Sequence, residues 1–421
     1  MKIFKFGGAS INSIDRFKNT ANIIQSFNGE KLLIVVSAMG KTTNALEAIV
    51  QAFCDNRKEE ALQLFEQLKQ QHQNILKYLV VSQWQQAENQ LKDFVTEIEW
   101  LLHDNPVRQY DYYYDQIVCC GELFSSSILA HHLKDVKVNA TWLDVRDIIR
   151  TDNHFRNASI DWEYTNKRMK ESVASLFEQY DVVITQGFIG ATDENESTTL
   201  GREGSDFSAA IFANLLNAAS VTIWKDVDAV MSADPKKFPD AAIIPSLSYT
   251  EVIEMAYYGA QVIHPKTIKP LQNKNIPLLV KSFLDPNLPG TKIDGQLTKN
   301  LPPIIVLKEK QVLIEFKSKD FSFVEGHLVA QLHELFGSIK INPNISQHTA
   351  ISLLCGFDDQ EEKINALAAA AADIFDVSME RQLDLLTIRH YDQAMISLLT
   401  ANKMVLLEQK TMQTIQLLLR K

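Results

Sequence analysis

Short apolar runs alternate with helical patterns through the first part of the chain. The runs are bounded by glycine or small polar residues and include KIFKF, KLLIVV, KVNATWLDV, DVVITQGFIG and SVTIWKDV. Continuous runs of this kind are typical of parallel strands that are buried on both faces. Segments with helical spacing, such as GELFSSSILAHHL and SDFSAAIFANLL, lie between them. The alternation predicts an α/β domain with a mostly parallel central sheet flanked by helices.

Between about residues 45 and 104 the pattern is helical throughout. This stretch is rich in glutamine, leucine and lysine, contains no glycine, and includes EALQLFEQLKQQHQNILKYLV, whose apolar residues recur three or four positions apart. We therefore predict a helical excursion of several turns within the α/β domain.

A segment rich in proline and glycine separates the chain into two regions. DPNLPGTKIDGQLTKNLPP, from Asp285 to Pro303, has four prolines and two glycines and little periodicity. It predicts a boundary between a first domain at residues 1–295 and a second region at 300–421. Strand and helix patterns in the second region indicate two small β-α-β-β units, and we expect the second unit to be truncated because no closing helix follows it.

Composition narrows the classes of partner and the compartment. The net charge of −10 and the pI near 5.5 argue against a nucleic-acid binder, which needs clustered lysine and arginine. No stretch of 18 or more apolar residues predicts a membrane span, and the N-terminus does not resemble a signal peptide. Four cysteines without a C-x-x-C pair indicate neither a disulfide scaffold nor a structural zinc site. We expect a cytoplasmic protein.

The first predicted strand leads into a candidate phosphate-binding turn. Lys5 ends the strand directly before Gly7 and Gly8, where backbone amides without side chains can approach phosphate oxygens and lysine supplies a point charge. The alternative is a solvated lysine next to a turn. The Gly-Lys-Thr sequence at 40–42 does not complete a Walker A loop, because Val35 stands where the first glycine belongs.

The segment GREGSD is the second candidate site. Arg202 offers a planar fork suited to a carboxylate, whereas a positive charge at a helix N-terminus is disfavoured by the helix dipole. Ser205 and Asp206 are alternatively explained as N-cap residues. Glu122, in the first turn of another helix, and the acidic turn after Lys225 are equally compatible with ordinary dipole and turn chemistry.

Seven motifs in collinear order resemble the aspartate kinases of the amino acid kinase superfamily. They are KFGGAS, SAMGKTTN, GE at 121–122, QGFIG, TTLGREGSD, DVDAVMSADP and YGAQVIHPKT. The resemblance spans residues 1 to about 295 and implies the amino acid kinase fold. The later units are similar to the tandem ACT modules of that family, which have a ferredoxin-like α+β fold.

The resemblance implies transfer of the γ-phosphoryl group of ATP to the side-chain carboxylate of L-aspartate, giving 4-phospho-L-aspartate. This reaction opens the route to lysine, threonine, methionine and isoleucine. An ionised carboxylate is already a nucleophile, so that catalysis reduces to positioning and charge stabilisation. The implied cofactors are ATP and Mg²⁺, with the metal held mainly by the ATP phosphates and by no protein ligand set.

The resemblance also assigns roles to residues. Lys5 would stabilise charge on the transferring phosphate, and Asp206 would hold Lys5 in place. Arg202 would clamp the α-carboxylate of aspartate, and Glu122 would accept its α-ammonium. Further hydrogen bonds to the substrate would come from Thr43 and Ser205. The phosphate- and nucleotide-binding positions would be Gly7, Gly8, Ser37, Lys225, Asp226, Met231, Lys236 and Gln261.

The chain departs from the family pattern near the nucleotide. The family commonly has threonine, tyrosine, arginine and lysine at the positions of Lys225, Met231, Lys236 and Gln261. Glu203 replaces a glycine of the commoner Gly-Arg-Gly-Gly-Ser-Asp, and a carboxylate there would oppose phosphate unless a cation compensates. Our hypothesis is that Lys225 compensates Glu203.

Regulation is left open by the sequence. The segments that match the family's effector site are 317–328 and 339–349, and Asn342 stands where an aspartate often grips the effector's ammonium. A neutral side chain loses that charge-assisted bond, so that an amino acid effector such as lysine or threonine is one alternative and pure dimerisation through paired sheets is the other. A homodimer or higher homo-oligomer is expected.

Three alternatives remain open. The first is another small-carboxylate or carbamate kinase of the same superfamily, and the second is a catalytically silent ACT-type amino acid sensor. The third is fusion to homoserine dehydrogenase, which occurs in some family members. No dinucleotide fingerprint is present in the sequence, so that we expect a monofunctional kinase.

Overall fold

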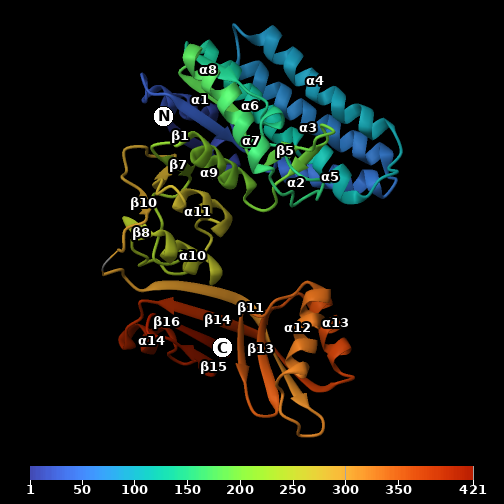
Figure 1. Cartoon of the computed structure of the whole chain (residues 1–421), viewed down its shortest axis with the longest axis vertical. Coiled ribbons are helices and arrows are strands. Elements are labelled where there is room, and N and C mark those ends of the chain that lie inside the picture. The colour runs from blue at the N-terminus through green and yellow to red at the C-terminus, as the bar shows by residue number, and fades with distance from the viewer. Residues whose placement is uncertain (299, 421) are drawn as a thin grey trace. The chain divides into compact units, whose positions relative to one another are not determined.

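The computed structural model describes residues 1–298 and 300–420 and divides into two compact units (Figure 1). Lys299, in the predicted boundary, and Lys421, in the predicted second region, lie outside the described residues. The first unit comprises Met1–Val230, Pro245–Ile253 and Val262–Leu297. The second takes Met231–Ile244 and Glu254–Gln261 in addition to the C-terminal region that begins at Thr298.

The first unit is built on an eight-stranded sheet in the order β3-β4-β2-β1-β7-β9-β10-β8. All neighbouring pairs are parallel except β9 with β10, so the predicted mostly parallel sheet is confirmed. Every residue of β2 is buried, as the run LLIVV requires of a strand covered on both faces. The strands are β1 (Lys2–Phe6), β2 (Leu32–Val36), β3 (Ala140–Trp142), β4 (Val182–Gln186), β7 (Val221–Lys225), β8 (Ser246–Ser248), β9 (Leu278–Ser282) and β10 (Thr291–Asp294).

Helices flank this sheet. α6 (Cys120–Asp135) is buried from Cys120 to Leu133, which explains why its sequence has apolar and small residues all round. The other helices of the unit are η1 (Gly8–Ile11), α1 (Ile14–Gln25), α5 (Tyr110–Val118), η2 (Val145–Asp147), α7 (Trp162–Arg168), η3 (Met169–Val173), α8 (Ala174–Gln179), α9 (Gly204–Leu216) and α11 (Pro265–Gln272). The unit also contains a two-stranded hairpin of β5 (Ile189–Ala191) and β6 (Ser197–Thr199). The helix α10 (Tyr249–Tyr257) begins in this unit and ends in the second.

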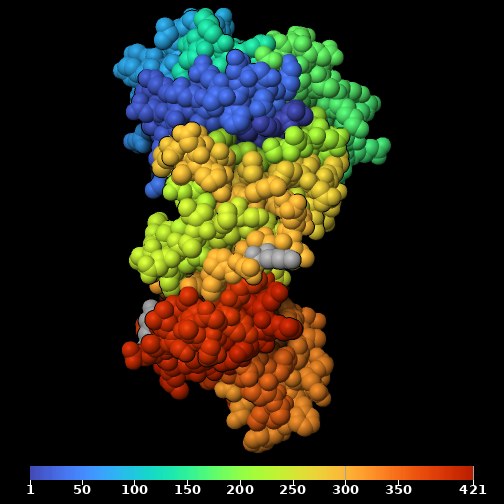
Figure 2. Space-filling view, turned by 90° about the vertical axis from the view of Figure 1, so that its left-hand side faces the viewer, coloured from blue at the N-terminus to red at the C-terminus, as the bar shows by residue number. Residues whose placement is uncertain are grey.

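Three long helices occupy the region for which a helical excursion is predicted. They are α2 (Thr42–Cys54), α3 (Lys58–Leu79) and α4 (Trp84–His103), joined by short turns. Each is amphipathic and buries one stripe, for example Ala61, Phe65 and Leu68 on α3. The space-filling view shows the surface of the N-terminal part of the chain, in blue and cyan, as closely packed (Figure 2).

The second unit carries a six-stranded antiparallel sheet in the order β12-β13-β11-β14-β16-β15. Its strands are β11 (Ile304–Ser318), β12 (Ile345–His348), β13 (Ser352–Asp358), β14 (Phe375–Arg389), β15 (Met404–Lys410) and β16 (Thr414–Arg420). The pairing of β11 with β14 is irregular near Lys308–Leu313. On one side of this irregularity the sheet packs on α12 (His327–Ile339) and α13 (Glu361–Ala371), and on the other β14 and β16 pack on α14 (Gln393–Leu399). This is the α+β arrangement that the sequence predicts.

The structure shows which residues cap the N-termini of two helices. α9 begins at Gly204 with Glu203 as its N-cap, so the interpretation of Ser205 and Asp206 as N-cap residues is wrong. His264 caps α11, since its side chain accepts a hydrogen bond from the Lys266 amide. Within the described ranges, no helix is long and apolar enough to cross a membrane.

Candidate active site

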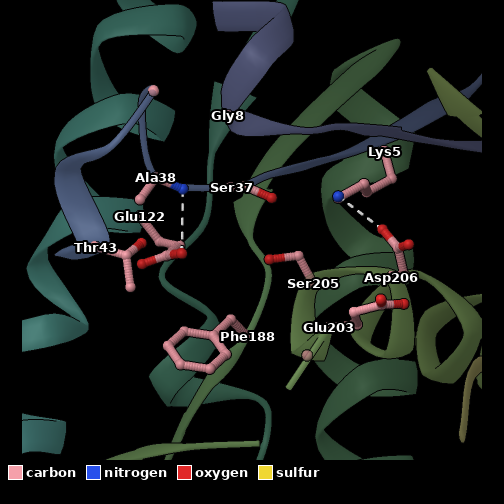
Figure 3. A pocket seen from close by; sticks show the side chains of 12 residues that line it. Lys5, Gly8, Ser37, Ala38, Thr43, Glu122, Phe188, Glu203, Ser205 and Asp206 are labelled. Carbon is pink, nitrogen blue, oxygen red and sulfur yellow. Dashed lines mark hydrogen bonds and ion pairs between the residues drawn. The ribbon is translucent and has the colours of Figure 1, made fainter. Parts of the chain in front are cut away.

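A cavity of about 260 Å³ opens in the first unit beyond the carboxyl ends of β1 and β2, the usual place for a ligand in a parallel sheet (Figure 3). Five segments that are distant in sequence form its walls: the loops after β1 and β2, the start of α6, the turn after β4 and the start of α9. The lining residues are Lys5, Gly8, Ser37, Ala38, Gly40, Thr43, Glu122, Phe188, Glu203, Gly204, Ser205 and Asp206.

An ion pair between Lys5 and Asp206 lies at one end of the cavity. Lys5 Nζ lies 2.7 Å from Asp206 Oδ1, and only 12% and 6% of the two side chains are exposed. Lys5 reaches this point because β1 ends one residue later, and Asp206 because it lies in the first turn of α9. A cation is therefore fixed at the cavity wall, as expected for a residue that stabilises phosphate charge.

The glycine turn beside Lys5 packs closely on the loop after β2. The Gly40 amide donates to the Gly8 carbonyl at 3.0 Å, and a Cβ on Gly8 would lie 2.5 Å from the Ala38 carbonyl oxygen. Any side chain at Gly8 would push the two loops apart. Gly7 lies next to the site without lining it, and a Cβ there would lie 3.5 Å from Lys5 Nζ.

The opposite end of the cavity is a buried carboxylate. Glu122 is 3% exposed; its Oε1 accepts a hydrogen bond from the Ala38 amide at 3.1 Å, and its Oε2 has no hydrogen-bond partner among the described residues. Burial raises the pKa of Glu122 to about 8, although hydrogen bonds and the charge of Lys5 oppose the rise. An incoming cationic group would supply the missing partner.

Small hydroxyl side chains and one aromatic ring lie between the two ends. Figure 3 shows Ser37 and Ser205 near the middle, Thr43 beside Glu122, and the Phe188 ring facing them. Phe188 was not among the predicted site residues, although it stands in the motif QGFIG. Its backbone is left-handed with φ of 71°, and its amide is held by Ser208 Oγ at 2.9 Å. The spacing of hydrophobic residues in the sequence cannot predict this left-handed turn.

Of the predicted phosphate- and nucleotide-binding residues, Gly8 and Ser37 line this cavity. Arg202 does not line it, and neither do Lys225, Asp226, Met231, Lys236 and Gln261. Arg202 and Asp226 are exposed. Lys225 donates a hydrogen bond to the Val262 carbonyl. Met231, Lys236 and Gln261 belong to the second unit.

Glu203 lines the cavity without a cation at its carboxylate. Among the described residues no lysine, arginine or histidine forms an ion pair with Glu203, so the hypothesis that Lys225 compensates it is not supported by the structure. The backbone of Glu203 is left-handed, with φ of 56°. This conformation suits glycine, which explains physically why glycine is the commoner residue at this position of the motif.

Comparison with known proteins shows which protein family the chain resembles. The profile of the amino acid kinase family matches residues 1–282. Lysine-sensitive aspartokinase 3 of Escherichia coli (strain K12) is 32% identical over 348 residues, covering 82% of this chain and 74% of that protein. Bifunctional aspartokinase/homoserine dehydrogenase 2, chloroplastic, of Arabidopsis thaliana is 30% identical over 398 residues, covering 90% of this chain.

The chain spans less than half the length of this plant relative, 42% of it. The crystal structure of E. coli aspartokinase III in complex with aspartate and ADP matches with a TM-score of 0.79 and 26% identity, covering 100% of this chain and 96% of that one. This likeness confirms the expected amino acid kinase fold followed by ACT-like modules. The chain belongs to the amino acid kinase family and, within it, to the aspartokinases.

Proposed function

We propose that the protein is an aspartate kinase, which transfers the γ-phosphoryl group of ATP to the side-chain carboxylate of L-aspartate to give 4-phospho-L-aspartate. The observation that carries the proposal is one cavity with a buried Lys5–Asp206 ion pair at one end and an unpartnered Glu122 carboxylate at the other. The first suits a transferring phosphate and the second an α-ammonium group. The related crystal structure of E. coli aspartokinase III is a complex with aspartate and ADP.

The phosphate end works by charge stabilisation. The carboxylate of aspartate is itself the nucleophile, so no residue has to remove a proton. Lys5 faces the phosphoryl oxygens as they pass from ATP to the acceptor, and Asp206 keeps the ammonium group of Lys5 at the cavity wall. A fixed cation of this kind costs no reorganisation during the reaction.

The amino acid end works by recognition of both α-groups. The α-ammonium of aspartate meets Glu122 Oε2, which favours the ionised carboxylate and displaces its proton. Thr43 and Ser205 donate hydrogen bonds near this end. Arg202 reaches the α-carboxylate when the exposed loop that carries it turns inward, a motion that Gly201 and Gly204 on either side permit.

We propose that the nucleotide binds together with Mg²⁺. Mg²⁺, when bound with ATP, neutralises charge on the phosphates. Among the described residues no group of three or more His, Cys, Asp or Glu could hold a metal ion. Lys225, Asp226, Met231, Lys236 and Gln261 remain predicted nucleotide contacts.

Further roles extend the proposal beyond the cavity. We infer that the reaction serves lysine, threonine, methionine and isoleucine synthesis in the cytoplasm, and that the chain forms a homodimer or higher homo-oligomer. An effector such as lysine or threonine is proposed at segments 317–328 and 339–349 of the second unit. The E. coli relative is lysine-sensitive by name. Asn342 argues for weaker effector binding here, because its neutral amide lacks the negative charge that an aspartate would offer the effector's ammonium.

The decisive test is an ADP-release assay with L-aspartate and Mg-ATP, repeated with lysine, threonine and methionine added. We expect aspartate-dependent ADP release and formation of the acyl phosphate, trapped as its hydroxamate. Release with carbamate or another small carboxylate but not with aspartate would indicate a different kinase of the superfamily. No release with any acceptor, together with amino acid binding, would indicate a sensor instead.

A further inference from the structure

A buried acid outside the cavity connects the two segments that recognise the amino acid in the proposed function. Asp115 on α5 is 0% exposed and does not line the cavity. A buried carboxylate is costly unless its oxygens are hydrogen-bonded. The bonds that it makes therefore indicate what it is for.

All three described hydrogen bonds of Asp115 hold loop or strand ends. Oδ2 accepts from the Thr199 amide at 2.8 Å and from the Arg156 amide at 2.9 Å, while Oδ1 accepts from the Thr199 hydroxyl at 2.7 Å. Desolvation by burial raises the pKa of Asp115 to about 6, and these hydrogen bonds oppose the rise. The carboxylate has no lysine or arginine within ion-pair distance among the described residues.

The neighbouring Gln116 makes a parallel set of bonds to the same strand. Its side-chain amide donates to the Ser197 carbonyl at 2.8 Å, and its side-chain oxygen accepts from the Ser197 amide at 3.0 Å. Two consecutive side chains of α5 thus pair with alternate residues of β6, as a strand backbone would. This double attachment fixes the register of β6 against α5.

Each side of this attachment leads directly to a substrate residue. Thr199 ends β6 and is followed by Arg202 and Ser205 within six positions. On the other side, Cys119 is the C-cap of α5 and the N-cap of α6, so that Glu122 follows Asp115 with only one non-helical residue between the helices. Few covalent or hydrogen-bonded steps therefore separate Glu122 from the Arg202 loop.

The segment that contains Arg156 packs against the loop that follows β6. The Ala158 amide donates to the Thr199 carbonyl at 3.0 Å, and a Cβ on Gly201 would lie 2.9 Å from Asn157 Oδ1. Arg156 itself has a left-handed backbone, with φ of 68°. Asp115 binds the amide of this strained residue, and so it holds the wall on which the Gly201 turn rests.

We propose that Asp115, assisted by Gln116, is a positioning residue that sets the spacing between Glu122 and the Arg202–Ser205 loop before aspartate binds. The inference rests on the proposed function, since it assigns these two segments to the two α-groups of one amino acid. It predicts that a loss of the Asp115 bonds affects aspartate more than ATP, because these bonds lead through Thr199 to Arg202 and Ser205, whereas Lys5 is carried by β1 in the central sheet.

The test compares Asp115→Asn with Thr199→Val, which removes one bond, and with Asp111→Asn as matched control. Asp111 lies on the same helix, but its carboxyl is 54% exposed and pairs with Arg156 at the surface. We expect Asp115→Asn to raise the KM for aspartate about tenfold with less than a twofold change in the KM for ATP, since small misplacements of a substrate clamp are costly. Thr199→Val should give a smaller change in the same direction, and Asp111→Asn none.

Hydrogen–deuterium exchange supplies a readout that does not depend on activity. The amides of residues 199–205 should exchange at least tenfold faster in Asp115→Asn than in the wild type or Asp111→Asn, because a neutral acceptor holds the loop less firmly. Equal rises in both KM values, or unchanged exchange of this loop, would overturn the positioning role. Should Asp115→Asn not fold, Thr199→Val decides by the same two measurements. A wild type without aspartate-dependent ADP release refutes the proposed function, while the exchange rates still decide whether Asp115 holds the loop.

Discussion

The two ends of the cavity differ in how far they are assembled without a ligand. At the Lys5 end the cation already lies 2.7 Å from Asp206, and both side chains are largely buried. At the Glu122 end one carboxylate oxygen has no partner among the described residues, and Arg202 is exposed outside the cavity. In Figure 3 the two ends face each other across Ser37 and Ser205.

Under the proposed function, the difference follows from the chemistry that each end performs. A group that stabilises charge in the transition state gains most when it is fixed beforehand, because no free energy is then spent on reorganisation during the reaction. A group that recognises substrate has to lose its bound water or its proton when the ligand binds. An assembled phosphate end and an open amino acid end are therefore compatible in one site.

The largest effect is expected from breaking the assembled end. Lys5→Met removes the fixed cation and leaves Asp206 as a buried charge without its partner. We expect kcat to fall by about a thousandfold and the KM for aspartate to change only a few-fold, as steady-state kinetics would measure. The melting temperature should also fall, since breaking a buried pair costs roughly 3–5 kcal/mol. A tenfold or smaller loss of kcat would contradict the role of Lys5.

Arg202 offers the next largest effect and tests whether the open end closes. Arg202→Ala should raise the KM for aspartate by about 30- to 150-fold, which corresponds to the roughly 2–3 kcal/mol of a charge-assisted pair. Arg202→Lys should recover part of the loss, because it restores the charge but not the planar fork. Unchanged kinetics in both variants would mean that Arg202 stays at the surface during the reaction.

This contrast also marks how far the sequence predicts the site. Local pattern and turn chemistry are sufficient to place Lys5 at a strand end and Glu122 in a first helical turn, because strand and helix ends are encoded in nearby residues. The fully buried run of β2 likewise predicts the centre of a parallel sheet. These features depend on periods of two or 3.6 residues and on glycine positions.

What the sequence could not predict depends on contacts across the fold. The Phe188 turn is left-handed because Ser208 and Leu200 hold its backbone, and neither residue is its neighbour in sequence. Lys225 donates to the carbonyl of Val262, which is 37 positions away in the sequence, and not to Glu203. Nothing in the sequence around Asp115 distinguishes it from other helical acids, and only its burial and its bonds to β6 indicate another role.

The unpartnered carboxylate of Glu122 predicts a pH dependence confined to the amino acid end. With its pKa raised to about 8, Glu122 is protonated at pH 7 in the empty site and loses its proton when an α-ammonium binds. The KM for aspartate should therefore fall as pH rises from 6 to 8, by at most about tenfold per pH unit, and level off above that. Glu122→Gln should abolish this slope. Calorimetry in two buffers should detect the released proton.

The same shift has a consequence for stability with a definite sign. Because the folded-state pKa of Glu122 is raised above its ordinary value of 4.5, the folded protein binds the proton more tightly than the unfolded chain. The contribution of this group to stability is present below about pH 4.5 and is lost as pH rises towards 8. Glu122→Gln should remove this loss, and thermal unfolding at pH 5 and pH 8 would measure it. An equal pH dependence in both proteins would contradict a buried, protonated Glu122.

The smallest effect is expected at Glu203, which adds negative charge to the otherwise assembled phosphate end. Glu203→Gln removes the charge and keeps the left-handed backbone, whereas Glu203→Gly removes both the charge and the conformational cost of about 1 kcal/mol. Both variants should lower the KM for Mg-ATP by about two- to fivefold, because one carboxylate no longer opposes the phosphates. Only Glu203→Gly should also change the free energy of unfolding. We expect that change to be less than about 1 kcal/mol, since glycine also loses more entropy on folding. A higher KM for Mg-ATP in Glu203→Gln would instead mean that this carboxylate attracts the cation bound with ATP.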